Sequence, residues 1–246
     1  MKKIVTLVLA LTLVFALASC NFSGNDSGLS ISAEQYTNAK VKSEGVMTYA
    51  AYAAAPLEAP VVIEAYVQDT QAWWDNKITV YAADLDGAYF LYEMACTEEN
   101  AAKLTPGTKI KVTGYKGAWA GEVEVIDATF EFVGEENDKY IAPALDVTKI
   151  ASKDSLVNYQ NQLVVFKGLE VVSVEYKGGE RGDDVYLNLK DDAAEYSFCV
   201  EKYLTDENTD VYKAVEALKA GDKVDVTGFA YWYNGINTHV TAVVKK

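Results

Sequence analysis

Apolar and polar residues alternate along several short runs of this chain, as they do on half-buried β-strands. In Lys77–Ala82, for example, Ile78 and Val80 alternate with Thr79 and Tyr81. Similar runs, bounded by turn residues, recur through most of the chain beyond residue 60. The pattern therefore predicts a mainly β protein.

One stretch of the chain occurs twice. Leu104–Ala128 and Leu218–Ala242 align without a gap at an offset of 114 residues, and eight of the 25 aligned positions are identical. In each copy a turn glycine precedes an alternating strand, and a later glycine, Gly121 or Gly235, reverses the chain into a further strand. Self-similarity at a fixed spacing indicates two copies of one β-rich unit.

Both copies predict the same order of elements: three strands, a short helix and two strands. This is the order of an OB-fold, a five-stranded Greek-key barrel. We therefore expect two tandem OB-fold-like barrels over residues 46–134 and 160–246, each with a short helix. A linker with a short helix is expected over residues 135–159.

The expected strands of the first copy are Val61–Val67, Lys77–Ala82, Ala88–Met94 and two strands within the repeated stretch, ending at Val133. Those of the second are Leu163–Val172, Val185–Leu189, Tyr196–Val200, Lys223–Gly228 and Ile236–Val244. The expected helices are Val46–Ala55, Thr97–Leu104 and one capped by Thr209.

The first 20 residues, MKKIVTLVLALTLVFALASC, combine two lysines, an apolar run and small residues, as a secretory signal does. Their end, Leu17-Ala18-Ser19-Cys20, resembles the lipobox of bacterial lipoproteins. The resemblance implies a signal peptide over residues 1–19, cleavage before Cys20 and a lipid anchor on Cys20. The alternatives are an ordinary secretory signal or an uncleaved membrane anchor. Residues 20–45, rich in Ser, Gly and Asn, are expected to form a flexible tether.

The segments WWDNKITVY, DGAYFLYEMAC and KLTPGTKIKVTGYKGAWAGEVEVIDATFEFV resemble the OB-like repeats of bacterial surface lipoproteins. The resemblance covers most of the mature chain, more strongly in the first copy. It implies the fold and a place in the bacterial cell envelope, facing outside the cytoplasm. It implies little about a ligand.

The chain is acidic, with 36 Asp and Glu against 22 Lys and Arg and a net charge of −14. Such a surface repels phosphate at long range, which makes nucleic acid the less expected partner. The single histidine, His239, has no clustered Cys or His, so we expect it to be structural or solvated. The sequence contains no nucleotide-binding or hydrolase motif. We therefore expect no cofactor, no metal site and no catalytic residue.

Two further groups of residues could carry chemistry. The acidic pairs lack the spacing of a calcium loop, so we interpret them as solvated loop charges, although their binding of calcium stays open; they are Asp183-Asp184, Asp191-Asp192 and Asp206-Glu207. Cys96 and Cys199 occupy non-equivalent places, and we expect free buried thiols rather than an inter-domain disulfide.

Aromatic residues gather at the expected connections. Those singled out as ligand-binding candidates are Trp73 and Trp74, between the first two strands, and Trp119, Trp232 and Tyr233, between the last two. In an OB-fold these connections flank the binding face, where rings can stack on a sugar or a base. We expect Trp73 or Trp74 beside Trp119, and Trp232 and Tyr233 at the matching rim near Ser173–Asp184. The alternative is that the rings plug the barrels or form the contact between them.

These features favour a non-catalytic, membrane-anchored binding module at the cell surface, with a glycan or a protein as ligand. The alternative is a single-stranded nucleic-acid binder that assists extracellular uptake or degradation, which would need Lys and Arg along its groove. A third possibility is an enzyme whose carboxylates the sequence does not place.

Overall fold

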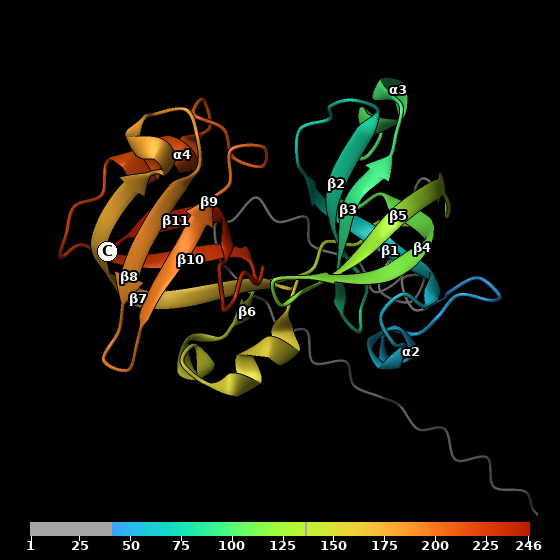
Figure 1. Cartoon of the computed structure of the whole chain (residues 1–246), viewed down its shortest axis with the longest axis horizontal. Coiled ribbons are helices and arrows are strands. Elements are labelled where there is room, and N and C mark those ends of the chain that lie inside the picture. The colour runs from blue at the N-terminus through green and yellow to red at the C-terminus, as the bar shows by residue number, and fades with distance from the viewer. Residues whose placement is uncertain (1–40, 136) are drawn as a thin grey trace, which may run out of the picture.

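The computed structural model describes residues 41–135 and 137–246, which form two β-rich units side by side (Figure 1). Cys20 and most of the expected tether lie outside the described residues. The first unit contains α2 (Tyr49–Ala54), β1 (Pro60–Thr70), β2 (Lys77–Ala83), β3 (Ala88–Ala95), α3 (Glu98–Ala101), β4 (Lys109–Trp119) and β5 (Glu122–Phe132).

The first unit is a closed five-stranded barrel with the strand order β1-β2-β3-β5-β4. All its neighbouring strands are antiparallel except β3 and β5, whose parallel pairing at Phe90↔Glu124 and Leu91↔Val125 closes the barrel. The inward-facing residues, among them Ile63, Val80 and Val112, form one core. The OB-like barrel expected from the first copy is therefore confirmed.

Helix α2 closes one end of this barrel. The side chain of Thr48 accepts a hydrogen bond from the Ala51 amide, which caps the start of the helix. Its one fully buried residue, Tyr52, packs into the barrel core against Tyr89. At the C-terminal end of the helix, the ammonium of Lys116 on β4 donates to the last carbonyls at 2.8–3.1 Å. The helix is thus tied to the barrel at both its side chains and its backbone.

The second unit contains β7 (Leu163–Tyr176), the 3₁₀ turn η3 (Lys177–Gly179), β8 (Val185–Lys190), β9 (Glu195–Val200), α4 (Asp210–Glu216), β10 (Lys223–Phe229) and β11 (His239–Lys245). Its strands form a six-stranded sheet in the order β10-β11-β9-β8-β7-β6, and β10 also pairs with β7. Alternate residues of β8, including Val185 and Leu187, point into the core. Thr209 caps α4, as predicted.

A second five-stranded barrel matching the first is not confirmed. The strands run in the expected order, but β11 meets β9 through a single parallel residue pair, His239↔Cys199. The sheet also gains a sixth strand, β6 (Leu145–Asp146), from the segment expected to be a linker. The expected strand Ile236–Val244 begins only at His239, because Ile236 forms an isolated bridge with Trp232 before it.

The segment between the units packs on the second unit. After β6 it forms two 3₁₀ helices, η1 (Thr148–Ile150) and η2 (Asp154–Tyr159), where one short helix was expected. Val147 and Leu156 are buried in the core of the second unit. The segment is therefore a structural part of that unit.

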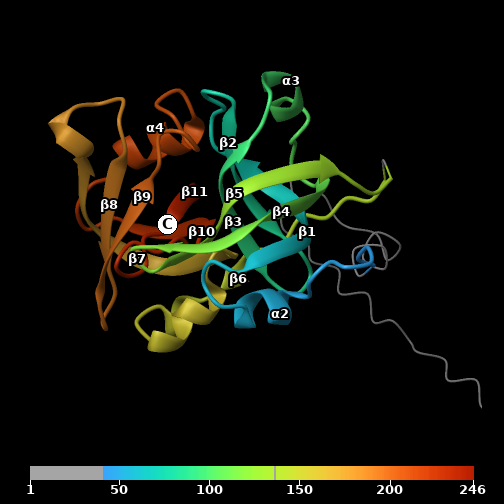
Figure 2. The same cartoon turned by 45° about the vertical axis from the view of Figure 1, so that its right-hand side comes forward.

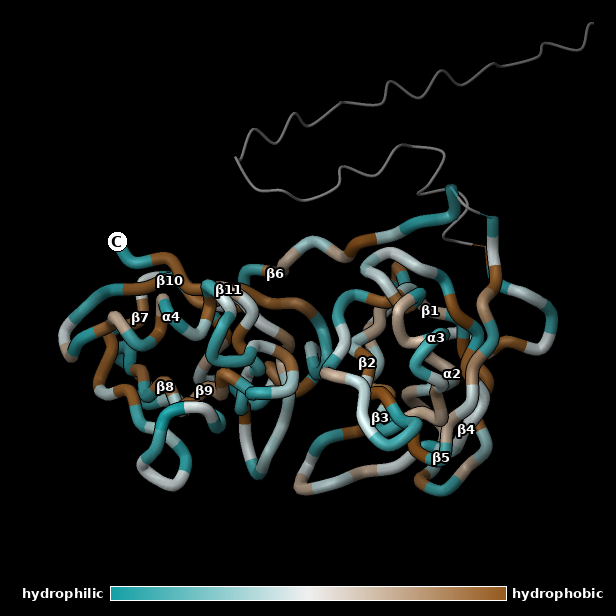
Figure 3. The backbone as a smooth tube through the Cα atoms, turned by 90° about the horizontal axis from the view of Figure 1, so that it is seen from above, coloured by the Kyte–Doolittle hydropathy of each residue, from teal (hydrophilic) through white to brown (hydrophobic). Residues whose placement is uncertain are grey.

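The two units meet through aromatic side chains. Tyr81 of β2 and Phe90 of β3 form one buried cluster with Phe229 of β10. The Tyr81 and Phe229 rings stack with centroids 4.3 Å apart, and Tyr231 packs edge-on against Phe90. From the turned view and from above, β2 and β3 lie along the side of the barrel that faces the second unit (Figure 2, Figure 3).

Candidate functional site

The two adjacent tryptophans of the β1–β2 connection point to different environments. Trp73 packs against the barrel core, and its indole N–H donates to the Cys96 carbonyl over 2.8 Å. Trp74 is 55% exposed and lines a pocket of about 240 Å³. Trp74 is thus the one member of the pair that is free to contact a ligand.

The aromatic residues of the two β-hairpin tips lie elsewhere. Trp119 and Tyr233 are 64% and 56% exposed, and the tips are joined by a hydrogen bond from the Asn234 amide to the Ala120 carbonyl. Trp232 is partly buried against the core of the second unit, and its backbone amide donates to Glu122 of the first. Trp232 therefore contributes to the contact between the units, which was the alternative interpretation.

Trp119 was expected beside Trp73 or Trp74, but it does not line the pocket that holds Trp74. In the β7–β8 connection, near which Trp232 was expected, Arg181 is bound to Glu207 and Glu216. Asp183 and Asp184 of the same connection pair with Lys202 and Lys177, so these predicted loop charges are neutralised within the chain.

The pocket beside Trp74 lies where the two units meet. Its first-unit wall comes from the β1–β2 connection and from β2 and β3, and its second-unit wall is Tyr203, in the connection that follows β9. The complete lining is Gln71, Ala72, Trp74, Lys77, Ile78, Thr79, Tyr92, Glu93 and Tyr203. Three of these residues, Trp74, Tyr92 and Tyr203, are large exposed aromatics.

A β-bulge directs two neighbouring side chains of β3 into the pocket. The pairing of β2 with β3 shifts register between Ile78 and Val80, and Glu93 has a positive φ of 44°. Its backbone amide donates to the hydroxyl of Thr79 over 3.1 Å. As a result Tyr92 and Glu93 both leave the core, although adjacent strand residues normally point to opposite faces. Bulges of this kind are common beside functional sites.

The polar groups of the pocket are close to charge balance. The ammonium of Lys77 lies 2.8 Å from Oε2 of Glu93, and this pairing raises the pKa of Lys77. Among the described residues that line the pocket, Glu93 is the one carboxylate and Lys77 the one cation. The site is therefore nearly neutral within an acidic protein.

Tyr203 is held in place by the turn that carries it. The carboxylate of Glu201 accepts the backbone amides of Tyr203 and Leu204 at 3.1 and 3.0 Å, although burial raises the pKa of Glu201 to about 7. The Tyr203 carbonyl accepts the Ala72 amide of the first unit over 2.7 Å. The ammonium of Lys202 lies 5.1 Å from the centre of the Tyr203 ring. Residues from both units thus fix the second wall of the pocket.

The face formed by β2 and β3, which OB-folds use for binding, is largely covered by the second unit. Tyr81 and Phe90 are buried there, against Phe229 and Tyr231. The pocket occupies the part of this face that stays open, next to the β1–β2 connection. The sequence-based expectation of a site at that connection is retained for Trp74, while the facing wall was not anticipated.

Two pocket residues, Tyr92 and Tyr203, were missed in the sequence analysis. Tyr92 belongs to an apolar run that predicts a strand, and the bulge that exposes it has no clear sequence signal. Tyr203 follows the strand end in a short acidic connection. Its aromatic character at a connection was the only available signal, and it was the same signal used for the tryptophans.

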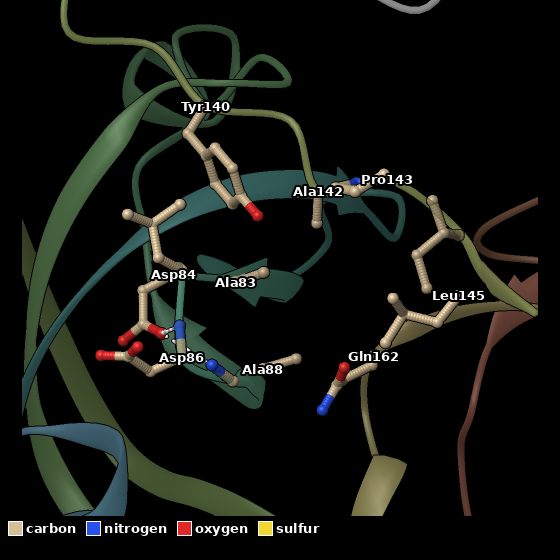
Figure 4. Close-up of a pocket in the computed structure, with 12 residues that line it drawn as sticks. Ala83, Asp84, Asp86, Ala88, Tyr140, Ala142, Pro143, Leu145 and Gln162 are labelled. Carbon is tan, nitrogen blue, oxygen red and sulfur yellow. Dashed lines mark hydrogen bonds between the residues drawn. The ribbon is translucent and has the colours of Figure 1, made fainter. Parts of the chain in front are cut away.

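A second cavity, of about 220 Å³, lies between the β2–β3 turn and the segment around Ala142 (Figure 4). Its walls are mainly apolar, with Gln162 on the side of the second unit. The carboxylate of Asp84 is engaged within the protein, by Lys42 and by the hydroxyl of Tyr89. This cavity therefore offers few free polar groups.

Metal-binding and thiol chemistry have little support in the structure. Within residues 41–135 and 137–246, no group of three or more His, Cys, Asp or Glu is arranged to hold a metal ion. Cys96 and Cys199 are free and buried, and burial raises the pKa of both thiols. His239 is also buried, and burial lowers its pKa to about 3, so its imidazole is neutral. In the described part of the chain, no helix is long and apolar enough to span a membrane.

No protein-family model and no curated protein matches the sequence. Among solved structures, the chain is similar to a murine DNA-binding protein bound to double-stranded DNA, with 14% identity over 76% of this chain and 96% of that one and a TM-score of 0.35. It is also similar to p202 HIN1 in complex with a 12-mer double-stranded DNA, with 14% identity over 85% and 99% of the two chains and a TM-score of 0.35. A replication protein A heterotrimer bound to single-stranded DNA matches with 9% identity over 84% and 51% of the chains and a TM-score of 0.31. At TM-scores this low, the similarity identifies neither a family nor a ligand.

Proposed function

We propose that this protein is a non-catalytic binding module whose ligand lies in the pocket between the two units. The observation that carries the proposal is the convergence of Trp74, Tyr92 and Tyr203 on one pocket, with each ring about half exposed. Exposed rings with polar edges stack on flat or apolar ligand faces. A glycosidase would need two carboxylates across the site, and Glu93, the one that lines it, is paired with Lys77.

The chemistry of the pocket favours an uncharged glycan as the ligand. Aromatic rings can pack on the apolar faces of sugar rings, while the amide of Gln71, the hydroxyl of Thr79 and the Lys77–Glu93 pair can bind sugar hydroxyls. A phosphate group would have to approach an acidic protein at a point where the nearest cation is already paired. A neutral ligand avoids that cost.

Single-stranded nucleic acid is the second candidate. The observation in its favour is that Lys202 lies over Tyr203 while Lys77 stands beside Tyr92 and Trp74, which is the combination of cation and ring that such binders use. DNA is also the partner named for the three similar structures, although similarities of that size do not decide between the candidates. Both lysines are paired with carboxylates, and this makes the candidate the weaker one.

Binding measurements on the mature protein separate the two candidates. We expect at least one neutral hexasaccharide from a panel (cello-, malto-, xylo- and manno-hexaose) to bind with little dependence on salt. Trp74→Ala should weaken that binding by roughly tenfold or more, since a buried stacking contact is worth about 1–3 kcal/mol. Tyr115→Ala, which removes a half-exposed ring from β4 outside the pocket, is the matched control.

Calorimetry or fluorescence titration would report these affinities. Tight binding of a dT12 oligonucleotide that falls steeply with salt would favour nucleic acid instead. If Trp74→Ala and Tyr115→Ala weakened binding equally, the pocket would not be the binding site.

We also propose that the module is anchored to a bacterial membrane through lipid on Cys20. The support is the lipobox-like Leu17-Ala18-Ser19-Cys20 and the apolar run before it, since several acyl chains hold a protein stably to a bilayer. Cys20→Ala should release the protein from the membrane fraction or leave it as an uncleaved precursor. Intact-mass analysis showing a mature protein with an unmodified Cys20 would rule out the anchor.

A further inference from the structure

A chain of three hydrogen-bonded side chains leads from the pocket into the second unit. Gln71, which lines the pocket, donates from Nε2 to the hydroxyl oxygen of Tyr81 over 3.2 Å. The same hydroxyl lies 2.5 Å from Nδ1 of His239. Tyr81 and His239 are both buried, and the Tyr231 ring stacks on the imidazole at 4.1 Å. The chain is therefore shielded from water at its inner end.

The direction of the protons in this chain follows from what each group can donate. An amide nitrogen only donates, so the Tyr81 oxygen accepts the hydrogen bond from Gln71. Within the described residues, Nδ1 of His239 is the one acceptor near the proton of the Tyr81 hydroxyl. That nitrogen must then be unprotonated, and the neutral imidazole carries its proton on Nε2.

We infer that Tyr81 and His239 are positioning residues that hold the Gln71 amide in one orientation, with its carbonyl oxygen as a fixed hydrogen-bond acceptor for a sugar hydroxyl in the pocket. This inference rests on the proposed function. Because one N–H of the amide nitrogen is engaged by Tyr81, the amide is held in one orientation, and its carbonyl oxygen is presented as an acceptor. In the described part of the chain, that oxygen accepts no hydrogen bond from another side chain.

A fixed acceptor selects the chemistry of its ligand. It binds a hydroxyl or an N–H group and disfavours a phosphate oxygen, which can only accept. The carboxylate of Glu93, which also lines the pocket, adds to this preference because it too can only accept hydrogen bonds. A histidine from the second unit thus sets the specificity of a pocket built mainly by the first.

The first test measures the tautomer of His239 in the ¹⁵N-labelled wild-type protein by long-range ¹H–¹⁵N NMR. We expect the shifts of an imidazole protonated at Nε2, unchanged between pH 5 and pH 8. A proton on Nδ1, or titration within that range, would overturn the inference. Nδ1 could then not serve as the acceptor for the Tyr81 proton, and the Tyr81 oxygen would not be fixed as the acceptor for Gln71. The measurement needs no ligand and no variant.

The second test compares the bound neutral hexasaccharide with its per-O-methylated form, which keeps the ring faces and loses every hydroxyl donor. In the wild type we expect the methylated sugar to bind more weakly. In Tyr81→Phe that selectivity should fall by roughly tenfold, the effect of losing one oriented hydrogen bond in a shielded site. Tyr176→Phe, which removes a hydroxyl bound to Glu216 far from the pocket, is the matched control.

The outcomes separate the inference from the proposed function. If the hexasaccharide binds and Tyr81→Phe keeps the wild-type selectivity, the positioning role is wrong while the pocket stands. If no hexasaccharide binds the wild type, the proposed glycan function fails, and the ligand class inferred from Gln71 fails with it. Salt-dependent binding of dT12 in the same pocket would also overturn that ligand class.

Discussion

Glu122 is fully buried (0% exposed) where the two units meet. Its Oε2 accepts the Trp232 amide over 2.7 Å, whereas Oε1 has no hydrogen-bond partner among the described residues. The pKa of this carboxyl is raised to about 8, mainly by burial. Its hydrogen bonds lower the pKa, and the negative charge of Glu124 raises it further. The carboxyl is therefore protonated in the folded protein at neutral pH.

The raised pKa predicts that stability falls as pH rises. The unfolded chain releases the proton near pH 4.5 and the folded chain only near pH 8, so the folded state binds more protons between these values. We expect Glu122→Gln to raise the free energy of unfolding at pH 8 by on the order of 2–4 kcal/mol and to change it little at pH 5. Urea unfolding at both values would measure this difference.

Glu131→Gln provides the control, since Glu131 lies on the same strand with its side chain 65% exposed. It should change stability equally little at pH 5 and pH 8. An effect of Glu122→Gln that does not depend on pH would contradict the buried, protonated state.

At the scale of the elements, the structure explains why both copies of the repeated stretch have a glycine at the same position of a strand. Gly114 lies in β4 and Gly228 in β10, and each strand shifts register against its antiparallel partner at that glycine. A Cβ on Gly114 would lie 2.8 Å from the Ile126 carbonyl oxygen, and one on Gly228 would overlap the His239 carbonyl oxygen. Both copies therefore need glycine because two backbones approach closely at a bulge.

We expect Gly228→Ala to lower the free energy of unfolding by on the order of 2 kcal/mol or more, since the backbone of β11 must move to admit the methyl group. The midpoint of thermal unfolding, followed by circular dichroism, would report the loss. Thr227→Ala, at the neighbouring position of β10, should cost much less. Similar midpoints for the two variants would show that the bulge tolerates a side chain.

At the scale of the whole molecule, the junction couples the two units. It contains the Tyr81–Phe229 stack and the buried Glu122. It also contains backbone contacts from Gln160 and Asn161, whose side chains bind the backbone of β5 and of the turn before it. The pocket depends on this junction, because its two walls belong to different units. Binding and the association of the units should therefore change together.

Phe229→Ala tests this coupling. We expect the wild type to unfold in one calorimetric transition and the variant to unfold earlier and in two, since truncating a buried Phe costs about 3–5 kcal/mol and here weakens the contact between the units. Phe132→Ala, in a ring 40% exposed at the end of β5, is the matched control. A single transition in Phe229→Ala would mean that the aromatic stack is not what couples the units.

Local chemistry was sufficient to predict most of the elements. Alternation predicted β2 within one residue at its C-terminal end, and threonine caps predicted α3 and α4 within a few residues. The 114-residue repeat predicted that β4 and β10 take equivalent places, each between two antiparallel partners. These features depend on neighbours close in the chain or on self-similarity, both of which a single sequence contains.

Only the tertiary structure decided which aromatic residues form the pocket. Trp73 turned into the barrel core and Trp232 into the contact between the units, while Tyr92 and Tyr203, 111 residues apart, came together. The same is true of the sixth strand of the second sheet, because β6 pairs with β7 through contacts that its sequence does not specify. The physical reason is that packing one unit on the other decides which rings are buried, and that packing depends on shape complementarity between surfaces far apart in the chain.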